Sequence, residues 1–235
     1  MFRLEQGLVE WEIPGMDKQA EYTLLERYLG REAATIVWQG QARPEDIGAV
    51  ESCFVFFADM CHFSRLTEQL PLKDLRRFLS NFFQLFVALI EEQGGSVNKF
   101  AGDGGLALFR ASPDQEAAMA PVTAALNLQA RFLQLRAEWQ KLAPPCGQVD
   151  LTVGISHGEV FLGTVGAAER FDFTVIGSAV NVAQRLAADA PAGGVYCCGA
   201  VQKRLSKSVC LRALGPVQLR GMATKISLFQ VLGWS

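Results

Sequence analysis

Two aspartates occupy positions where a carboxylate is costly unless a positive charge accompanies it. Asp59 ends the apolar run "CFVFFADM", and Asp103 sits in the glycine-rich middle of "NKFAGDGGLALF". If these two segments pair in one sheet, the carboxylates converge and repel each other unless a cation lies between them. Mg²⁺ suits such a pair, because it takes one or two protein carboxylates and completes its shell with phosphate oxygens and water. By spacing alone, each aspartate is also an ordinary turn or strand-end residue.

The segment "MCHFSRLTEQ" follows Asp59 and leads into a helical pattern. Backbone N–H groups at a strand-to-helix turn form an anion site, which places the amides of Phe63 and Ser64 among the candidate substrate contacts. An ordinary helix N-cap supplied by Ser64 or Thr67 is compatible with this interpretation.

A second polar pair lies in "SAVNVAQRL", where Asn181 and Arg185 are four residues apart and share one helix face. An arginine and an asparagine presented together suit the stabilisation of phosphoryl charge and the orientation of a sugar. An exposed polar stripe on an amphipathic helix explains the same spacing.

The hydrophobic pattern after residue 51 alternates between strands and helices. Strands are predicted at 52–60, 150–160, 170–177, 195–198, 209–219 and 225–233, a hairpin at 98–109, and helices at 72–95, 114–142, 178–190 and 200–206. This order predicts an α+β fold, a ferredoxin-like βαββαβ core with additional strands and helices.

Residues 1–50 differ from the rest of the chain. They contain the polar, helix-compatible stretch "DKQAEYTLLERYLGREAATIVWQG" and the turn-prone "QARPEDIG". We therefore expect an N-terminal helical lead-in or linker over 1–50 and a single domain over 51–235.

Composition excludes several classes of protein. The 235 residues carry a net charge of −2, which gives no overall attraction to nucleic acid or to an anionic membrane. Six cysteines without a CxxC motif and only two histidines argue against zinc. No stretch approaches the roughly 20 apolar residues of a membrane span, and the N-terminus lacks the pattern of a signal peptide. The prediction is a cytoplasmic protein without a membrane span or a nucleic-acid partner.

Four motifs in order resemble the class III nucleotide cyclases. "FFADMCHFS" is similar to their metal-binding strand, "VNKFAGDGGLALF" to their second metal hairpin, "VGISHGEVFLGTVGAAERFDFTVIGSAVNVAQRLA" to their central block, and "VQLRGMATKISLFQVLG" to their terminal strands. The resemblance covers the chain from about residue 50 to its end. The preceding "LERYLGREAATIVWQG" is similar to the helical segment that links such domains to sensors.

The resemblance implies a cyclase catalytic domain with two metal ions, Mg²⁺ or Mn²⁺, in each active site. Asp59 and Asp103 match the metal ligands, with the Met60 carbonyl as a further ligand. Asn181 matches the residue that orients the ribose, and Arg185 the residue that stabilises the transition state. In this reaction the ribose 3′-hydroxyl attacks the α-phosphorus in line and pyrophosphate leaves.

The resemblance also implies the substrate. Lys99 and Thr174 match the base-reading pair, in which an ammonium donates to adenine N1 and a hydroxyl accepts from the adenine amino group. This pair resembles the Lys/Thr subclass of adenylate cyclases, several of which respond to bicarbonate. ATP is the expected substrate, bicarbonate or a sensor domain the expected regulator, and GTP or a pyrimidine nucleotide the alternative. A basic residue for the β- and γ-phosphates is either Arg220 or Lys225.

Family members work as head-to-tail dimers, so the resemblance implies a homodimer with two shared active sites. The chain departs from the family pattern at His62, where glycine is usual, and at Ser178, a serine N-cap where aspartate is frequent. The alternative is a catalytically silent cyclase-like module for dimerisation or sensing, which usually loses a metal aspartate or the arginine. A diguanylate cyclase is disfavoured because "AGDGG" lacks that family's second acidic residue.

Overall fold

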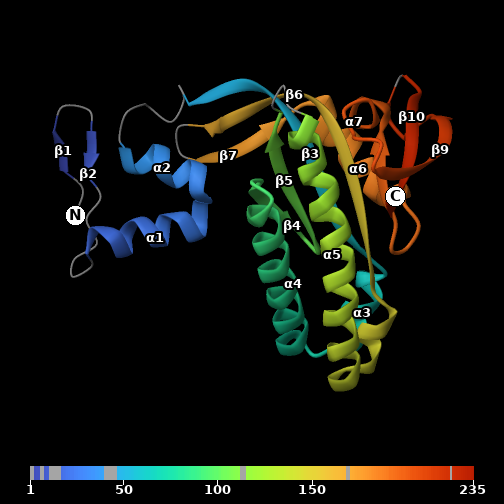
Figure 1. Ribbon diagram of the computed structural model, residues 1–235. Helices are drawn as coiled ribbons and strands as arrows, with labels where there is room; N and C mark the ends of the chain where they lie inside the picture. The colour runs from blue at the N-terminus through green and yellow to red at the C-terminus, as the bar shows by residue number, and fades with distance from the viewer. Residues whose placement is uncertain are drawn as a thin grey trace. The chain divides into compact units, whose positions relative to one another are not determined.

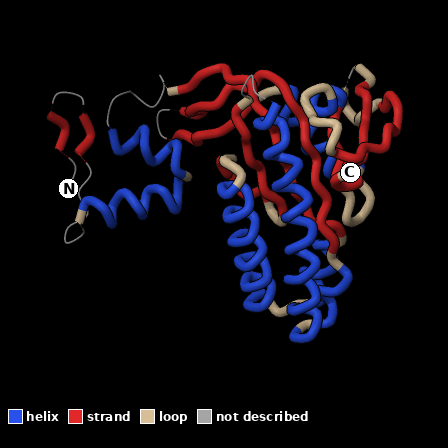
Figure 2. The backbone as a smooth tube through the Cα atoms, in the orientation of Figure 1, coloured by secondary structure: helices blue, strands red, loops and turns tan. Residues whose placement is uncertain are grey.

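The computed structural model describes residues 3–5, 8–10, 17–39, 47–111, 115–167, 170–222 and 224–235. These residues belong to two compact units, which are labelled by element in Figure 1 and coloured by secondary structure in Figure 2. The first unit comprises Met1–Ala49 and Phe161–Val175, and the second comprises Val50–Val160 and Ile176–Ser235.

The first unit contains strands β1 (Arg3–Glu5) and β2 (Leu8–Glu10) and helices α1 (Lys18–Leu29) and α2 (Arg31–Gln39). Asp17 caps α1 by accepting a hydrogen bond from the Ala20 amide at 2.9 Å. Across the two helices, the hydroxyls of Tyr22 and Thr35 lie 3.0 Å apart. Helices α1 and α2 occupy the stretch for which the sequence predicts helix. Strands β1 and β2 were not predicted. The domain boundary near residue 50 stays a prediction.

The main sheet has the strand order β4-β5-β3-β6-β8-β10-β9, with β7 paired to β6 off this path. Its first four strands have the order of a ferredoxin-like βαββαβ core, which confirms the predicted fold class. The remaining elements are β3 (Gly48–Cys61), α3 (Phe63–Gln69), α4 (Leu72–Glu92), β4 (Ser96–Ala101), β5 (Gly104–Arg110), α5 (Gln115–Leu142), the 3₁₀ helix η2 (Pro144–Gln148), β6 (Asp150–Ala167), β7 (Arg170–Ile176), α6 (Ser178–Asp189), β8 (Val195–Cys198), α7 (Gly199–Gln202), β9 (Val209–Val217) and β10 (Ile226–Trp234).

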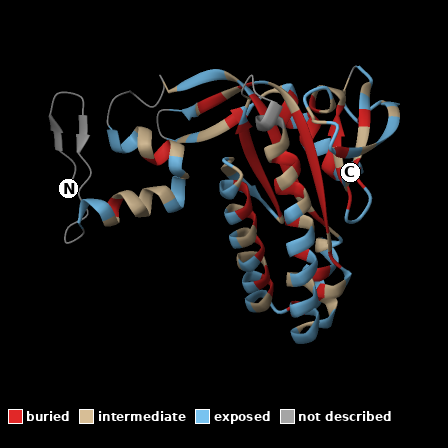
Figure 3. Ribbon diagram, viewed as in Figure 1, coloured by how far each residue is buried: buried red, intermediate tan, exposed pale blue. Residues whose placement is uncertain are grey.

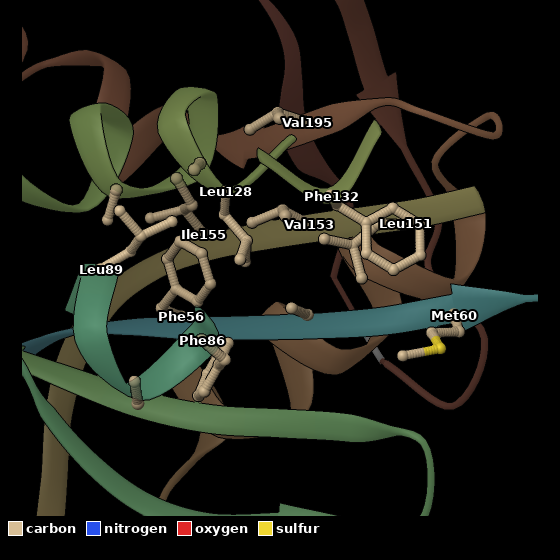
Figure 4. Packing of buried hydrophobic residues seen from close by; sticks show 14 of the residues in the cluster. Phe56, Met60, Phe86, Leu89, Leu128, Phe132, Leu151, Val153, Ile155 and Val195 are labelled. Carbon is tan, nitrogen blue, oxygen red and sulfur yellow. The ribbon is translucent and has the colours of Figure 1, made fainter. Parts of the chain in front are cut away.

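Helices α4 and α5 cover one face of this sheet in the second unit. The helix and strand side chains between them form a hydrophobic core, shown in Figure 4, and the buried face of α4 is red in Figure 3. Helix α4 packs tightly on β5 at Gly105, because a Cβ there would lie 2.7 Å from the Phe86 ring. The two helices are tied together where the Trp139 indole N–H donates to the Asn81 side-chain oxygen at 3.0 Å.

Helix α6 packs on the opposite face, against β6. A Cβ on Gly154 would lie 2.5 Å from the Ala187 amide nitrogen, so the helix backbone rests directly on this glycine. The Ser156 hydroxyl also donates to the Ala179 carbonyl at 2.6 Å. Because strand side chains alternate in direction, neighbouring residues of β6 serve the two layers.

Two expectations about helix starts are wrong. Neither α3 nor α6 has a side-chain cap: α3 begins after His62 and α6 after Gly177. Ser64 lies inside α3, where its carbonyl accepts from the Thr67 hydroxyl at 2.7 Å, so neither residue is an N-cap. Ser178 is the first residue of α6 rather than its cap.

None of the helices that the structure describes combines the length and the hydropathy needed to cross a membrane. A cytoplasmic location stays a prediction.

The close packing of α6 on β6 can be tested by substituting two glycines of β6. Gly154→Ala should lower the free energy of unfolding by about 1–3 kcal/mol, because the new methyl group displaces the α6 backbone. Gly158→Ala is the matched control, since its Cβ would meet only the Ala179 Cβ at 3.3 Å. Urea denaturation measures both. Equal losses in the two variants would contradict the close packing of α6 on Gly154.

Candidate functional site

The β4–β5 hairpin brings the two aspartates together. Ala58 of β3 pairs with Gly105 of β5, so the end of β3 lies beside the turn that carries Asp103. A Cβ on Gly104 would lie 2.6 Å from the Ala58 carbonyl oxygen and 2.9 Å from Asp59 Oδ1. Only glycine therefore lets the Asp59 carboxylate lie against the hairpin.

Burial makes both carboxylates costly to ionise, and the charge of Asp103 adds to this cost at Asp59. Burial, reinforced by the charge of Asp103, raises the pKa of Asp59 to about 6, while a hydrogen bond from the Met60 amide opposes the rise. Burial also raises the pKa of Asp103, against hydrogen bonds from its own amide and from that of Met60. A cation between the carboxylates would remove this repulsion.

The donor set fits a hard divalent cation. Both side chains offer carboxylate oxygens, the ligands that Mg²⁺ and Mn²⁺ prefer. The Met60 side chain is buried in the core, so only its backbone faces the carboxylates. No cluster of three or more His, Cys, Asp or Glu side chains arranged to hold a metal occurs in the described parts of the chain. The two carboxylates would form the protein's part of the ligand shell of such a cation.

Two residues beside the aspartates were missed in the sequence. The Thr152 hydroxyl donates to the Asp59 carbonyl at 3.2 Å and so fixes the end of β3 against β6. Burial raises the pKa of the Cys61 thiol, and the negative charges of Asp59, Asp150 and Asp103 raise it further. A hydrogen bond with Thr152 acts in the opposite direction. The thiol is therefore protonated at neutral pH and does not compete for a hard cation. The role of Thr152 depends on how β6 lies against the end of β3, which residue types alone do not reveal.

The chain then turns into α3 with unusual backbone geometry. His62 has φ 66°, the sole positive φ outside glycine among the residues that the structure describes. A glycine is usual at this position in the family that the sequence resembles, and His62 adopts the left-handed conformation that glycine favours. Phe63 and Ser64 are the first residues of α3, and no side chain caps their amides.

Lys99 lies on the same sheet face as Asp59. It pairs with Leu106, which in turn pairs with Phe57, and Phe57 and Asp59 point to one side of β3 because they are two residues apart. The Lys99 side chain is exposed. Thr174 lies on β7, in the first unit.

Asn181 and Arg185 point away from the sheet. Both are exposed, whereas the buried stripe of α6 faces β6 on the other side of the helix. Among the described residues, no carboxylate forms an ion pair with Arg185. Within the described residues, no hydrogen bond or ion pair joins either side chain to Asp59 or Asp103.

The two candidate phosphate contacts near the C-terminus stay alternatives. Arg220 lies in the turn after β9, Lys225 directly precedes β10, and both are exposed. No described interaction distinguishes between them.

Comparison with known proteins gives a family match. The model of the adenylate and guanylate cyclase catalytic domain matches residues 46–233. An uncharacterized protein of Mycobacterium tuberculosis is 32% identical over 167 residues, which cover 69% of this chain and 28% of that protein. The chain thus spans just over a quarter of the length of such relatives.

Solved structures give the same result. The adenylyl cyclase CyaB from P. aeruginosa has a TM-score of 0.72 and 26% identity, covering 79% of this chain and 95% of that one. The guanylyl cyclase Cya2 has a TM-score of 0.70 at 23% identity, covering 80% of this chain and 95% of that one, and at this identity it shows the fold alone.

The paired aspartates predict how stability depends on pH. Without metal, folded Asp59 titrates at about 6 and the unfolded side chain at 3.8, so the folded state holds more protons between these values. Stability of the metal-free protein should therefore fall as the pH rises from about 4 through about 6. In Asp59→Asn the fall should be smaller, as measured by urea denaturation in EDTA across this range.

Asp189→Asn, an exposed carboxylate at the end of α6, is the control and should follow the wild type. The same pH dependence in Asp59→Asn as in wild type would contradict the raised pKa of Asp59.

Proposed function

Because the chain belongs to the adenylate and guanylate cyclase catalytic domain family, we propose that it converts ATP to 3′,5′-cyclic AMP and pyrophosphate. Class III cyclase domains work as dimers on nucleotide substrates and use divalent metal ions. The observation that carries the proposal is the convergence of Asp59 and Asp103 at Gly104, where each has a raised pKa. Two half-buried carboxylates that lie close together cost stability, and a cation bound between them removes this cost.

Asp59 and Asp103, with the Met60 carbonyl, hold two divalent cations, Mg²⁺ or Mn²⁺. Bound there, the cations favour deprotonation of the ribose 3′-hydroxyl and neutralise the triphosphate. Thr152 keeps the Asp59 backbone in place through its 3.2 Å hydrogen bond. The uncapped amides of Phe63 and Ser64 donate to the phosphates.

The base is recognised by Lys99 and Thr174. The Lys99 ammonium donates to adenine N1, an atom that carries a hydrogen in guanine and so rejects this donor. The Thr174 hydroxyl accepts from the adenine amino group. The exposure of Lys99 on the Asp59 face of the sheet supports a role at a surface shared with a second chain.

The sugar and the reacting phosphate are handled by α6. Asn181 orients the ribose, and Arg185 offsets the charge that develops on the α-phosphoryl group as the 3′-oxygen attacks in line. Arg220 or Lys225 holds the β- and γ-phosphates of the leaving pyrophosphate. The outward direction of Asn181 and Arg185 supports a homodimer in which each serves the aspartates of the other chain.

The proposal predicts turnover of ATP in the presence of Mn²⁺ or Mg²⁺. Asp103→Ala should lower the rate at least about a hundredfold, because the metal charge supplies several kcal/mol of transition-state stabilisation. Asp189→Asn should keep the wild-type rate. Product is measured by chromatography after incubation with ATP, GTP, CTP or UTP, with and without bicarbonate.

The nucleotide panel separates the outcomes. Faster turnover of GTP or of a pyrimidine nucleotide would overturn the assignment of ATP. The absence of product from every nucleotide would indicate a silent module that dimerises or senses a ligand.

A further inference from the structure

A pocket lies in the second unit, at a distance from the paired aspartates. Its volume is about 330 Å³, and residues of β6, α6, β8, α7 and β10 form its walls. Thr152 contacts Asp59, whereas Ser156 and His157, which line the pocket, come four and five residues later on β6. At the rise of an extended strand, the pocket lies about 13 Å or more along β6 from the aspartates.

Three residues that carry hydrogen-bond donors border this pocket. Ser178, Ser227 and Lys203 are among its lining residues, all three are exposed, and none of their side chains has a hydrogen bond or ion pair among the described residues. No carboxylate is part of the lining. Helix α6, 12 residues long, begins at Ser178 without a side-chain cap, so its first amides and the positive end of its dipole lie at the same wall.

The positive charge of the lining resides on Lys203. The His157 ring packs on Phe54 with centroids 4.7 Å apart, and its Nε2 lies 3.3 Å from the Ser52 hydroxyl. Burial, together with the nearby Arg204 guanidinium, lowers the pKa of His157, so its ring is neutral at pH 7. Lys203 is then the one fully charged group among the described residues of the lining.

Most of the remaining wall is apolar. The side chains of Val182, Ile226, Ala179 and Cys198 line it, and Val182, Ala179 and Cys198 are buried. A bare inorganic ion would leave this surface uncovered, whereas a ligand with a small hydrocarbon part would bury it. The pocket size matches a molecule of this kind.

We propose that this pocket binds a small molecule that carries one oxyanion group, a carboxylate or a phosphate, on a compact apolar body. The oxyanion accepts hydrogen bonds from the Ser178 hydroxyl, the Lys203 ammonium and the first amides of α6. The apolar body packs on Val182 and Ile226. Such a ligand stabilises the first turn of α6, the helix that also carries Asn181, and so gives the pocket a means of regulating the chain.

Binding can be tested on nucleotide-free protein, so the outcome does not depend on cyclase activity. Isothermal titration and ligand-observed NMR with n-butyrate, butyramide and inorganic phosphate compare a charged, an uncharged and a purely ionic probe. Butyrate should bind more tightly than butyramide, which has the same shape without the charge. Lys203→Met should weaken binding of the anion about tenfold, whereas Lys73→Met, an exposed lysine of α4, should leave it unchanged.

The two anions identify the head group. If Lys203→Met weakens the binding of butyrate but not that of inorganic phosphate, the ligand's head group is a carboxylate. If it weakens only the binding of phosphate, the head group is a phosphate. The proposal is overturned if neither anion binds saturably, if Lys203→Met and Lys73→Met behave alike, or if butyramide binds as well as butyrate. Ser178→Ala, which removes one hydroxyl from the site, should reproduce part of the loss.

Discussion

The close approach of two carboxylates at a single glycine constrains the rest of this structure. Asp59 and Asp103 come from segments more than 40 residues apart, and they meet because β3 and β5 pair in a register that places Gly104 against Asp59. On the opposite face of the sheet, Phe86 of α4 packs on Gly105 of β5 and stabilises this pairing of strands. Hydrophobic burial under α4 and α5 therefore supplies the free energy that offsets the repulsion between the aspartates.

A second constraint acts through α6. Its backbone lies on Gly154, and this fixes which side of the helix is buried and leaves Asn181 and Arg185 facing outward. The chain thus presents its acidic pair on the sheet and Asn181 and Arg185 on a helix surface that faces away from it. In the proposed reaction a single copy would hold both pairs without joining them, which agrees with a family whose members work as dimers.

Much of this could be predicted from residue type and period. The apolar runs around Phe56 and along α4 have the periods of a buried strand and an amphipathic helix, and the motif around Asp103 marks the hairpin. The roles of Gly104 and Thr152 were not predictable, because they depend on strand register. The predicted N-caps were wrong because α3 begins directly after His62 and α6 directly after Gly177, and neither residue supplies a side-chain cap. The assignment of Thr174, Arg220 and Lys225 still rests on resemblance, since no contact within the described residues decides it.

The most direct test of shared active sites is complementation between two inactive variants. Lys99→Ala and Asp103→Ala, each purified alone, should show little activity, and their mixture should regain about a quarter of the wild-type rate, because half of the randomly exchanged dimers carry one intact site. The rate of cyclic nucleotide formation after mixing measures this. A mixture no more active than its parts, with subunit exchange confirmed by mass spectrometry, would contradict the account.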